Sequence, residues 1–426
     1  MIVRGGTVVT SRGSQFVDIA IADGRITEVG RHLDEDADII DATGLHIFPG
    51  GIDSHVHFNE PGRTEWETIA NGSAALAAGG YTTFIDMPLN NLPVTTTVEA
   101  FDLKLDAMKR SSRVDFGLWG GLVPGNLDQL DGLVKRGVMG FKAFMCPSGI
   151  DEFPACDERT LREGMKRIAE LDSILLVHAE DPAQLTEPKG PTVRDFVESR
   201  PYRAEDSAVY NAIEWAHEAG CRLHIVHVST VPAAGLVHAT RVNGVDVTGE
   251  TCPHYLLYGE EDLERLGGIG KCAPPFRGRV FLDDMWRTLN HGWLQMVVSD
   301  HSPSTLDLKQ GDDFRKIWGG ISGCQSTRQL LLADERLEPP LIAALTSTNI
   351  AERFGLEHKG DVAPDFDADL WIVDLDHEDV VRREDLLYRN PFSVHEGQRI
   401  RGRTVRTLLR GKDPGRGEFI RPGARS

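Results

Sequence analysis

The sequence is poor in cysteine and contains no long hydrophobic run. Its six cysteines are scattered over 426 residues, and no two of them form a CxxC pair. Such usage is typical of a reduced protein rather than of a disulfide framework. Apolar runs such as Ile174–Val177 are far shorter than the ~18 residues that cross a membrane. The N-terminal stretch also lacks the apolar core of a signal peptide, so we expect a cytoplasmic protein.

Basic residues are too few to suggest a nucleic-acid-binding protein. There are 46 lysines and arginines against 65 acidic residues, which gives a net charge of −19 at pH 7. Such a charge repels nucleic acids and anionic membranes, and no basic stripe offsets it. We therefore expect no nucleic-acid and no membrane partner, and we interpret the acidity as a contribution to solubility.

Short β-forming segments occur at both ends of the chain. Neither end alone offers enough strands for a stable core, although Ala22-Asp23-Gly24 supplies a hairpin turn. We therefore expect residues 1–49 and 355–426 to form one small composite β domain. Its expected strands are Ile2–Arg4, Thr7–Thr10, Phe16–Ile21, Arg25–Val29, Ala368–Asp374 and Thr404–Arg410.

Between the two ends, short apolar segments alternate with helix-like stretches that repeat apolar residues every three or four positions. Eight such units over residues 50–354 predict a (β/α)₈ barrel of the TIM type. A doubly wound open sheet is disfavoured because no GxGxxG follows the first strand. The expected strands are His46–Phe58, Tyr81–Pro88, Asp115–Leu122, Gly140–Met145, Ser173–Glu180, Arg222–Ser229, Val247–Tyr255 and Leu294–His301.

Residues able to bind metal stand where these expected strands end, which is where a barrel of this type has its active site. His55 and His57 are one residue apart, so on a strand they point to the same face. One such histidine alone would be an ordinary structural residue, but the joint pattern indicates a metal site. The candidates are His55, His57, Lys142, His178, His227 and Asp300.

Three further histidines lie in or near the expected strand ends. His224 precedes His227 by three residues and therefore faces the opposite side of the strand. We expect it to be structural. His254 and His301 lie close to strand ends, and the pattern leaves their roles open.

Lys142 is the unusual member of the candidate set. An ammonium group beside a metal ion is both desolvated and repelled, at a cost of several kcal/mol. The alternative is a lysine that extends from the barrel rim into solvent. If the amine instead stays neutral and takes up carbon dioxide, the resulting carbamate is an anionic ligand long enough to bridge two cations. Two divalent ions together with this carbamate, Asp300 and a bridging hydroxide then carry only a small net positive charge.

Neutral imidazoles combined with carboxylate-type oxygens favour zinc, with manganese, cobalt or iron as alternatives. Two such ions share a water molecule, lower its pKa toward ~7 and polarise a carbonyl group. Asp300 would accept a proton from the metal-bridging hydroxide and deliver it to the leaving nitrogen. The predicted chemistry is metal-assisted hydrolysis, with Asp300 as the catalytic acid and base.

Several blocks of the sequence resemble the cyclic amidohydrolases of the amidohydrolase superfamily. They include "SHVHFNEPGR", "GFKAFM", "VHAED", "HIVHVS", "GETCPHYL" and "VVSDHSP", and they run in family order through nearly the whole barrel. The resemblance implies a small-molecule substrate and a homo-oligomer, either a tetramer or a dimer. It also implies a ligand set: His55, His57 and Asp300 on the more buried ion, His178 and His227 on the other, and N6-carboxylated Lys142 between them.

Departures from related groups narrow the substrate class. Dihydroorotases typically have an arginine where this chain has Asn59, and an asparagine where it has Leu89. Both contacts to a substrate carboxylate are therefore absent. Hydantoinases and dihydropyrimidinases usually place a tyrosine five residues after the bridging lysine, where this chain has Pro147. Within the family the chain is thus most similar to the allantoinases, which open the neutral ring of (S)-allantoin to give allantoate in purine degradation.

Two alternatives stay open beside this interpretation. The first is a hydantoinase-like or dihydropyrimidinase-like amidase with looser specificity. The second, more remote, is a metal-free relative that serves as an assembly scaffold, although such relatives lose metal ligands and this chain keeps all six. The polar stretch Ser302–Trp318 is either a lid or an ordinary loop, and Gly319 and Gly320 permit close approach of the backbone to a substrate.

Overall fold

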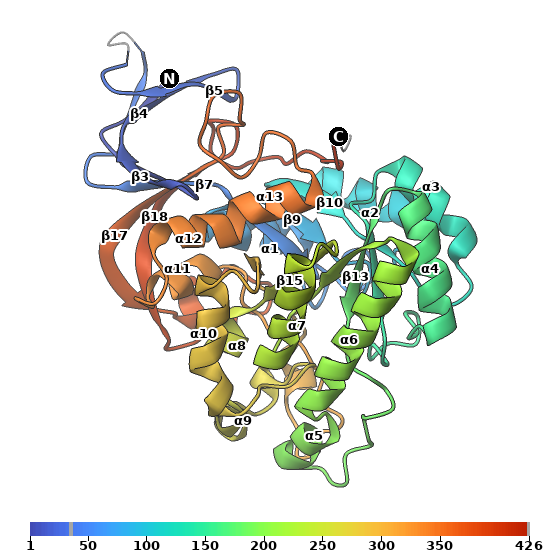
Figure 1. The fold of residues 1–426 in the computed structure, drawn as a ribbon. Coiled ribbons are helices and arrows are strands. Elements are labelled where there is room, and N and C mark those ends of the chain that lie inside the picture. Colours follow the sequence, from blue (N-terminus) through green and yellow to red (C-terminus); the bar gives the residue numbers. More distant parts are fainter. Residues whose placement is uncertain (34–36, 424–426) are drawn as a thin grey trace.

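The computed structural model describes residues 1–33 and 37–423, and eight parallel strand positions form its centre (Figure 1). Each strand is hydrogen-bonded to the next along the chain, in two sheets of order β8-β9-β10 and β11 to β16. The strands are β8 (Gly51–Val56), β9 (Tyr81–Asp86), β10 (Asp115–Leu118) with its continuation β11 (Gly120–Gly121), β12 (Phe141–Phe144), β13 (Ile174–His178), β14 (Arg222–Ile225), β15 (Val247–Thr251) and β16 (Met296–Val297).

A single parallel bridge between Val56 and His301 joins the last strand position to the first and closes the barrel. The (β/α)₈ prediction is therefore confirmed. The last expected strand, Leu294–His301, is much shorter in the structure, where β16 contains only Met296 and Val297. The regular strand ends at Val297, and the backbone turns to a positive φ of +46° at Asp300.

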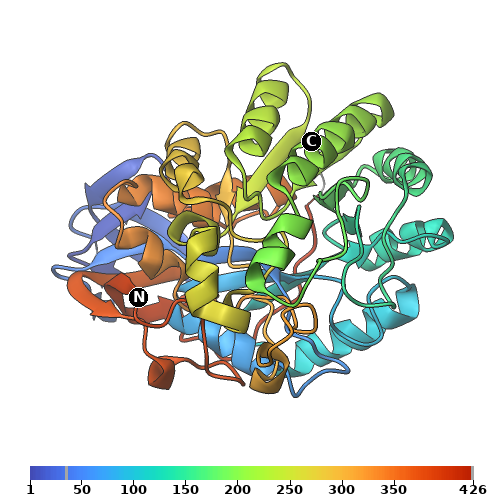
Figure 2. The same cartoon turned by 90° about the horizontal axis from the view of Figure 1, so that it is seen from below.

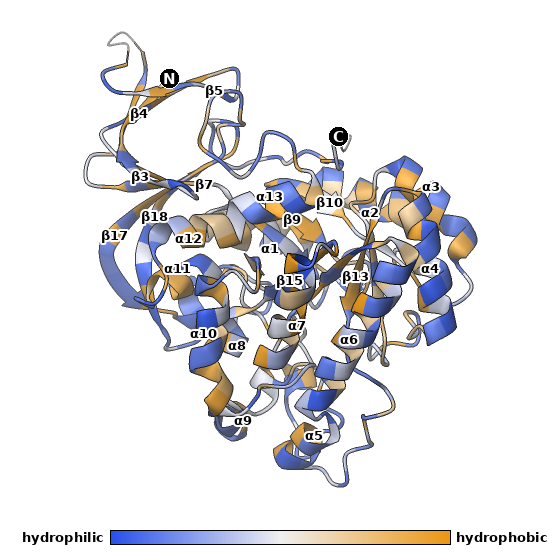
Figure 3. Cartoon of the chain, in the orientation of Figure 1, coloured by the Kyte–Doolittle hydropathy of each residue, from blue (hydrophilic) through white to orange (hydrophobic). Residues whose placement is uncertain are grey.

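Helices surround the strands on the outside, as the view along the barrel shows (Figure 2). They turn hydrophilic residues outward (Figure 3), and in α4 the buried face is spaced by three and four residues at Leu161, Met165 and Ile168. No helix in the described ranges is both long and apolar enough to span a membrane. The helices are α1 (Ile69–Ala78), α2 (Val98–Ser111), α3 (Leu130–Arg136), α4 (Glu158–Glu170), α5 (Val193–Ser199), α6 (Tyr202–Ala219), α7 (Val231–Val242), α8 (Pro253–Leu257), α9 (Glu260–Leu266), α10 (Leu282–Asn290), α11 (Thr327–Leu332), α12 (Pro339–Ala343) and α13 (Asn349–Phe354).

Strands from both ends of the chain form a β domain beside the barrel (Figure 1). One sheet has the order β5-β4-β1-β6, and the other has the order β18-β17-β7-β2-β3, so the second sheet combines strands from the N-terminal and C-terminal segments. The expected hairpin turn is present, with positive φ at Asp23 (50°) and Gly24 (81°). The strands are β1 (Ile2–Arg4), β2 (Thr7–Thr10), β3 (Gly13–Phe16), β4 (Asp18–Ala22), β5 (Arg25–Gly30), β6 (Ile39–Asp41), β7 (His46–Pro49), β17 (Leu370–Val380) and β18 (Arg399–Leu408).

The expected single strand His46–Phe58 is two strands. The first of them, β7, pairs with β17 and β2 in the β domain, and the second, β8, begins the barrel. The change of sheet occurs at Gly50, where a Cβ atom would lie 2.2 Å from Thr82 Oγ1. Only glycine fits such a close approach, so this residue joins the two domains.

A buried cluster of charges ties the β domain to the base of the barrel. The ammonium group of Lys359 lies 2.7 Å from Asp115, 3.0 Å from Asp367 and 2.8 Å from Asp369. Asp115 belongs to barrel strand β10, whereas the other two aspartates precede β17. The cation therefore occupies the point where three carboxylates from two domains meet.

Replacing Lys359 by methionine is expected to lower the free energy of unfolding by about 3–5 kcal/mol. The change leaves the buried Asp369 without a cation and leaves Asp115 and Asp367 with only Arg410 and Arg25, respectively. Denaturant unfolding at neutral pH, followed by far-ultraviolet circular dichroism, measures the change. Lys412→Met, at an exposed lysine, is the matched control and is expected to change stability by less than about 0.5 kcal/mol. Equal stability of the two variants would contradict a structural role for the cluster.

Candidate active site

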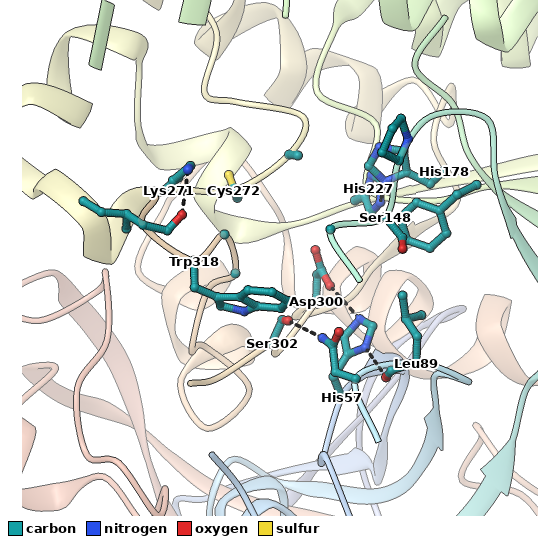
Figure 4. A pocket seen from close by; sticks show the side chains of 18 of the residues that line it. His57, Leu89, Ser148, His178, His227, Lys271, Cys272, Asp300, Ser302 and Trp318 are labelled. Carbon is teal, nitrogen blue, oxygen red and sulfur yellow. Dashed lines mark hydrogen bonds and ion pairs between the residues drawn. The ribbon is translucent and has the colours of Figure 1, made fainter. Parts of the chain in front are cut away.

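A cavity of about 410 Å³ opens at the C-terminal ends of the barrel strands. His57, His178, His227 and Asp300 converge on it in Figure 4, and His55 also lines it. Lys142 lies just beneath, buried to 1% exposure on β12. The structure therefore brings all six predicted residues together, from five different strand ends.

The four imidazole rings form a continuous row across the base of the cavity. Ring centroids are 5.5 Å apart for His57 and His55, 5.5 Å for His55 and His227, and 4.7 Å for His227 and His178. Asp300 extends beside one end of this row. Its Oδ1 atom is 3.2 Å from His55 Nε2 and 3.5 Å from His57 Nε2.

Hydrogen bonds at the far side of three rings determine which nitrogen faces the cavity. The Nδ1–H of His55 donates to Glu250 Oε1 (2.5 Å), and the Nδ1–H of His57 donates to the Leu89 carbonyl (3.1 Å). The Nε2–H of His178 donates to Glu180 Oε2 (2.8 Å). The opposite nitrogen of each ring is then an acceptor, as a metal ligand must be.

The spacing of these acceptors fits a metal site. Tetrahedral zinc at its usual bond lengths places neighbouring ligand atoms about 3.3 Å apart. The contacts of Asp300 with His55 and His57 (3.2 and 3.5 Å) and the contact between His178 Nδ1 and His227 Nε2 (3.0 Å) have this separation. Burial lowers the pKa of His57, His178 and His227, which keeps the rings neutral. The residues present therefore fit one or two divalent cations.

Lys142 also fits a metal site, although a lysine side chain is ordinarily positively charged. Its Nζ atom is buried and has no hydrogen-bond partner in the described part of the chain. Burial lowers the pKa of this amine to about 7, although the nearby Glu250 and Asp300 oppose the change. A large part of the amine is consequently neutral at neutral pH, which is the form that reacts with carbon dioxide.

Backbone strain coincides with two of the candidate ligands. His227 and Asp300 have φ values of +40° and +46°, in a region that costs a non-glycine residue about 1–3 kcal/mol. His227 lies two residues beyond the end of β14, and Asp300 lies three residues beyond the end of β16. The strained backbone aims their side chains into the cavity rather than along the alternating faces of a sheet.

Glu250 on β15 is a functional neighbour that the sequence pattern did not reveal. Its carboxylate is completely buried and accepts hydrogen bonds from His55 (2.5 Å) and from the Nε2–H of His224 (3.1 Å). His224 is therefore not in the ligand row, as predicted, but it orients the row through Glu250. Thr248 Oγ1 completes the chain by donating to His224 Nδ1 (2.7 Å).

The two histidines whose roles stayed open also lie near the site. His254 is fully buried, and neither of its ring nitrogens has a hydrogen-bond partner in the described ranges. Its ring lies close to Cys252 and Asp300. His301 instead accepts a hydrogen bond from the Gly323 backbone (3.2 Å) and packs against Tyr388. His301 therefore has a structural role at the closure of the barrel.

The stretch Ser302–Trp318 forms one wall of the cavity and is tied down by two buried lysines. Lys271 donates to the carbonyls of Phe314 and Ile317, both at 2.6 Å. Lys309 donates to the carbonyls of Trp318 (2.9 Å) and Gly320 (2.6 Å). In this structure the stretch is an anchored wall.

Residues that distinguish related groups lie partly in this cavity. Leu89 and Pro147 line it, and neither side chain offers a hydrogen bond to a substrate. Asn59, in contrast, directs its side-chain amide to the Pro303 carbonyl (3.2 Å). Gly320 has φ +145°, and a Cβ there would lie 2.3 Å from the Ser302 carbonyl. A glycine is therefore needed here for contact with the Ser302 backbone rather than with a substrate.

Known proteins resemble the chain over almost its whole length. It is 50% identical to an allantoinase of Rubrobacter xylanophilus, over 99% of this chain and 97% of the relative. It is 47% identical to an allantoinase of Solibacter usitatus, over 96% and 92% of the two chains.

Hydantoinases are among the solved structures that superpose on the chain. The L-hydantoinase (dihydropyrimidinase) from Arthrobacter aurescens superposes with a TM-score of 0.95 at 30% identity, over 99% of both chains. A D-hydantoinase superposes with a TM-score of 0.91 at 28% identity, over 99% of this chain and 98% of that one. Residues 46–404 match the amidohydrolase family. This match spans the barrel and all six candidate residues, and the chain belongs to the amidohydrolase family.

Proposed function

We propose that this amidohydrolase is an allantoinase, a hydrolase that opens the ring amide of (S)-allantoin to give allantoate. The observation that carries the proposal is the identity of 50% over 99% of the chain with a protein of that name. The cavity of about 410 Å³ is of the size that holds a small ring compound. The apolar Leu89 and Pro147 in its wall suit a neutral substrate better than a carboxylate.

The proposed ligand set is the one that the resemblance implied. His55, His57 and Asp300 would hold one divalent ion, and His178 and His227 the second. Such ions, when bound, supply a Lewis acid for a carbonyl oxygen and an activated water. Zinc is the metal that this donor set favours.

We further propose that Lys142 is carboxylated and bridges the two ions. The support is its buried amine without a partner, which is costly in either charge state unless the group is modified or ligated. A cytoplasmic location, a role in purine degradation and a homo-oligomeric state, tetramer or dimer, stay predictions.

Each protein group has a separate task in the proposed reaction. Glu250 and Glu180 hold His55 and His178 with the required nitrogen facing the cavity. Asp300, whose side chain is 13% exposed, would take up a proton at a carboxylate oxygen and release it to the leaving ring nitrogen. The anchored wall from Ser302 to Trp318 limits the access of water to the ring.

A hydantoinase-like activity is the second candidate, because the L-hydantoinase from Arthrobacter aurescens superposes with a TM-score of 0.95. The lower sequence identity of that structure, 30%, ranks it behind the allantoinase proposal. A metal-free scaffold is disfavoured, since all six candidate ligand positions hold metal-binding residue types.

The deciding experiment compares allantoin, hydantoin and dihydrouracil as substrates of the metal-replete enzyme. We expect kcat/KM for allantoin to exceed the other two values by at least about 10-fold, a difference of about 1.4 kcal/mol in the transition state. Metal analysis of the same sample is expected to give two ions per subunit. Faster turnover of hydantoin or dihydrouracil would replace the allantoinase proposal with the hydantoinase one.

Lys142→Ala is expected to abolish activity, because it removes the group proposed to bridge the ions. Acetate or propionate with added metal is expected to restore part of the activity, since a free carboxylate can take the place of the carbamate. The wild-type enzyme with the same acids is the control and should gain nothing. Full activity of Lys142→Ala without any acid would remove the carbamate from the proposal.

Asp300→Asn is expected to lower kcat by at least about 100-fold, the range for loss of a general acid and base. Steady-state kinetics at saturating allantoin measure the change. Asp307→Asn, at an exposed aspartate in the following stretch, is the matched control and should stay within about twofold of the wild type. A similarly small effect at Asp300 would place the proton transfer on another group.

A further inference from the structure

Arg200 lines the cavity at the side of His178, in the short connection between α5 and α6. The position of its backbone is held by Arg277, which donates to the Arg200 carbonyl (2.7 Å). Arg277 is in turn paired with the buried Glu205 and with Ser229. The guanidinium group of Arg200 is therefore carried on a rigid support.

Two of the three guanidinium nitrogens of Arg200 are occupied within the protein. Its Nε donates to Glu180 Oε1 (3.1 Å), and its Nη2 donates to Glu180 Oε2 (2.5 Å) and to Cys146 Sγ (3.5 Å). Nη1 has no partner among the residues that the structure describes. Because the side chain is only 19% exposed and lines the cavity, this donor is available to a bound molecule.

The charge of Arg200 is already balanced. Glu180 is fully buried, and both of its carboxylate oxygens accept hydrogen bonds from the Arg200 guanidinium. The Arg200–Glu180 pair is consequently neutral as a unit. A neutral pair with a free N–H favours an uncharged oxygen acceptor over a second carboxylate.

The other cations that line the cavity are not available in this way. Lys271 is engaged by the carbonyls of the anchored wall. Arg315 binds Asp313 through Nε and Nη2 in the same way, but its side chain is 48% exposed, and that of Lys316 is 84% exposed. Among the lining cations in the described ranges, Arg200 alone combines a largely buried side chain with an unused donor.

We infer that Arg200 Nη1 donates a hydrogen bond to the carbonyl oxygen of the ureido group on the substrate ring. The inference rests on the proposed function and deepens it, since it assigns the residue that distinguishes a ring with this substituent from a bare one. Arg200 is connected through Glu180 to His178, so the donor and the proposed metal site lie on the same wall. A site that hydrogen-bonds a substituent rejects analogues without it, because its buried donor then stays unpaired.

The test uses Arg200→Lys and Arg200→Met in the metal-replete full chain, with allantoin and unsubstituted hydantoin as substrates. Lysine keeps a positive charge beside Glu180 but cannot serve both the carboxylate and the cavity. We expect kcat/KM for allantoin to fall about 10- to 100-fold in both variants, the range for a hydrogen bond from a charged group. The value for hydantoin is expected to change by less than about threefold in Arg200→Lys, with unchanged metal content.

Arg203→Lys is the matched control, because it makes the same substitution at an exposed arginine of α6 that does not line the cavity. It is expected to stay within about twofold of the wild type for both substrates. Equal loss on both rings in Arg200→Lys, or no loss on allantoin, would overturn the assignment of Arg200. A wild-type enzyme that does not prefer allantoin over hydantoin would instead overturn the proposed function, so the two failures are distinguishable.

Discussion

The burial of a lysine amine among neutral imidazoles is the constraint on which the site depends. Lys142 has no partner in the described chain and lies at 1% exposure, so a permanent positive charge there would be costly. A neutral amine there still lacks a hydrogen-bond partner, which costs free energy unless the group is ligated or modified. The proposed carbamate and metal ions would meet that condition together.

Buried carboxylates behind the imidazoles hold the rings in their orientations. Glu250 joins His55 to His224, and Glu180 joins His178 to Arg200. Each carboxylate selects the tautomer of a candidate ligand, and each uses a different outer partner. On the Glu180 side, one carboxylate therefore contacts both a ring of the candidate ligand row and the proposed substrate donor.

The cavity is formed by elements that are rigid for different reasons. The strand ends are held by the barrel, whose closure depends on the short contact between Val56 and His301. The wall from Ser302 to Trp318 has little regular structure and depends on the ammonium groups of Lys271 and Lys309. This division lets the chemistry stay on the barrel while the wall sets the shape of the space above it.

The sequence by itself determined the barrel, the composite β domain and the six candidate residues, because these follow from local alternation and from strand-end positions. It did not reveal the Glu250–His55 and Glu180–Arg200 contacts, since these residues are 195 and 20 positions apart and meet only in the folded chain. It also showed that Asn59 replaces an arginine, but only the fold shows that this side chain donates to the Pro303 carbonyl. Only the tertiary structure decided these contacts, because hydrogen-bond direction is set by packing and not by local pattern.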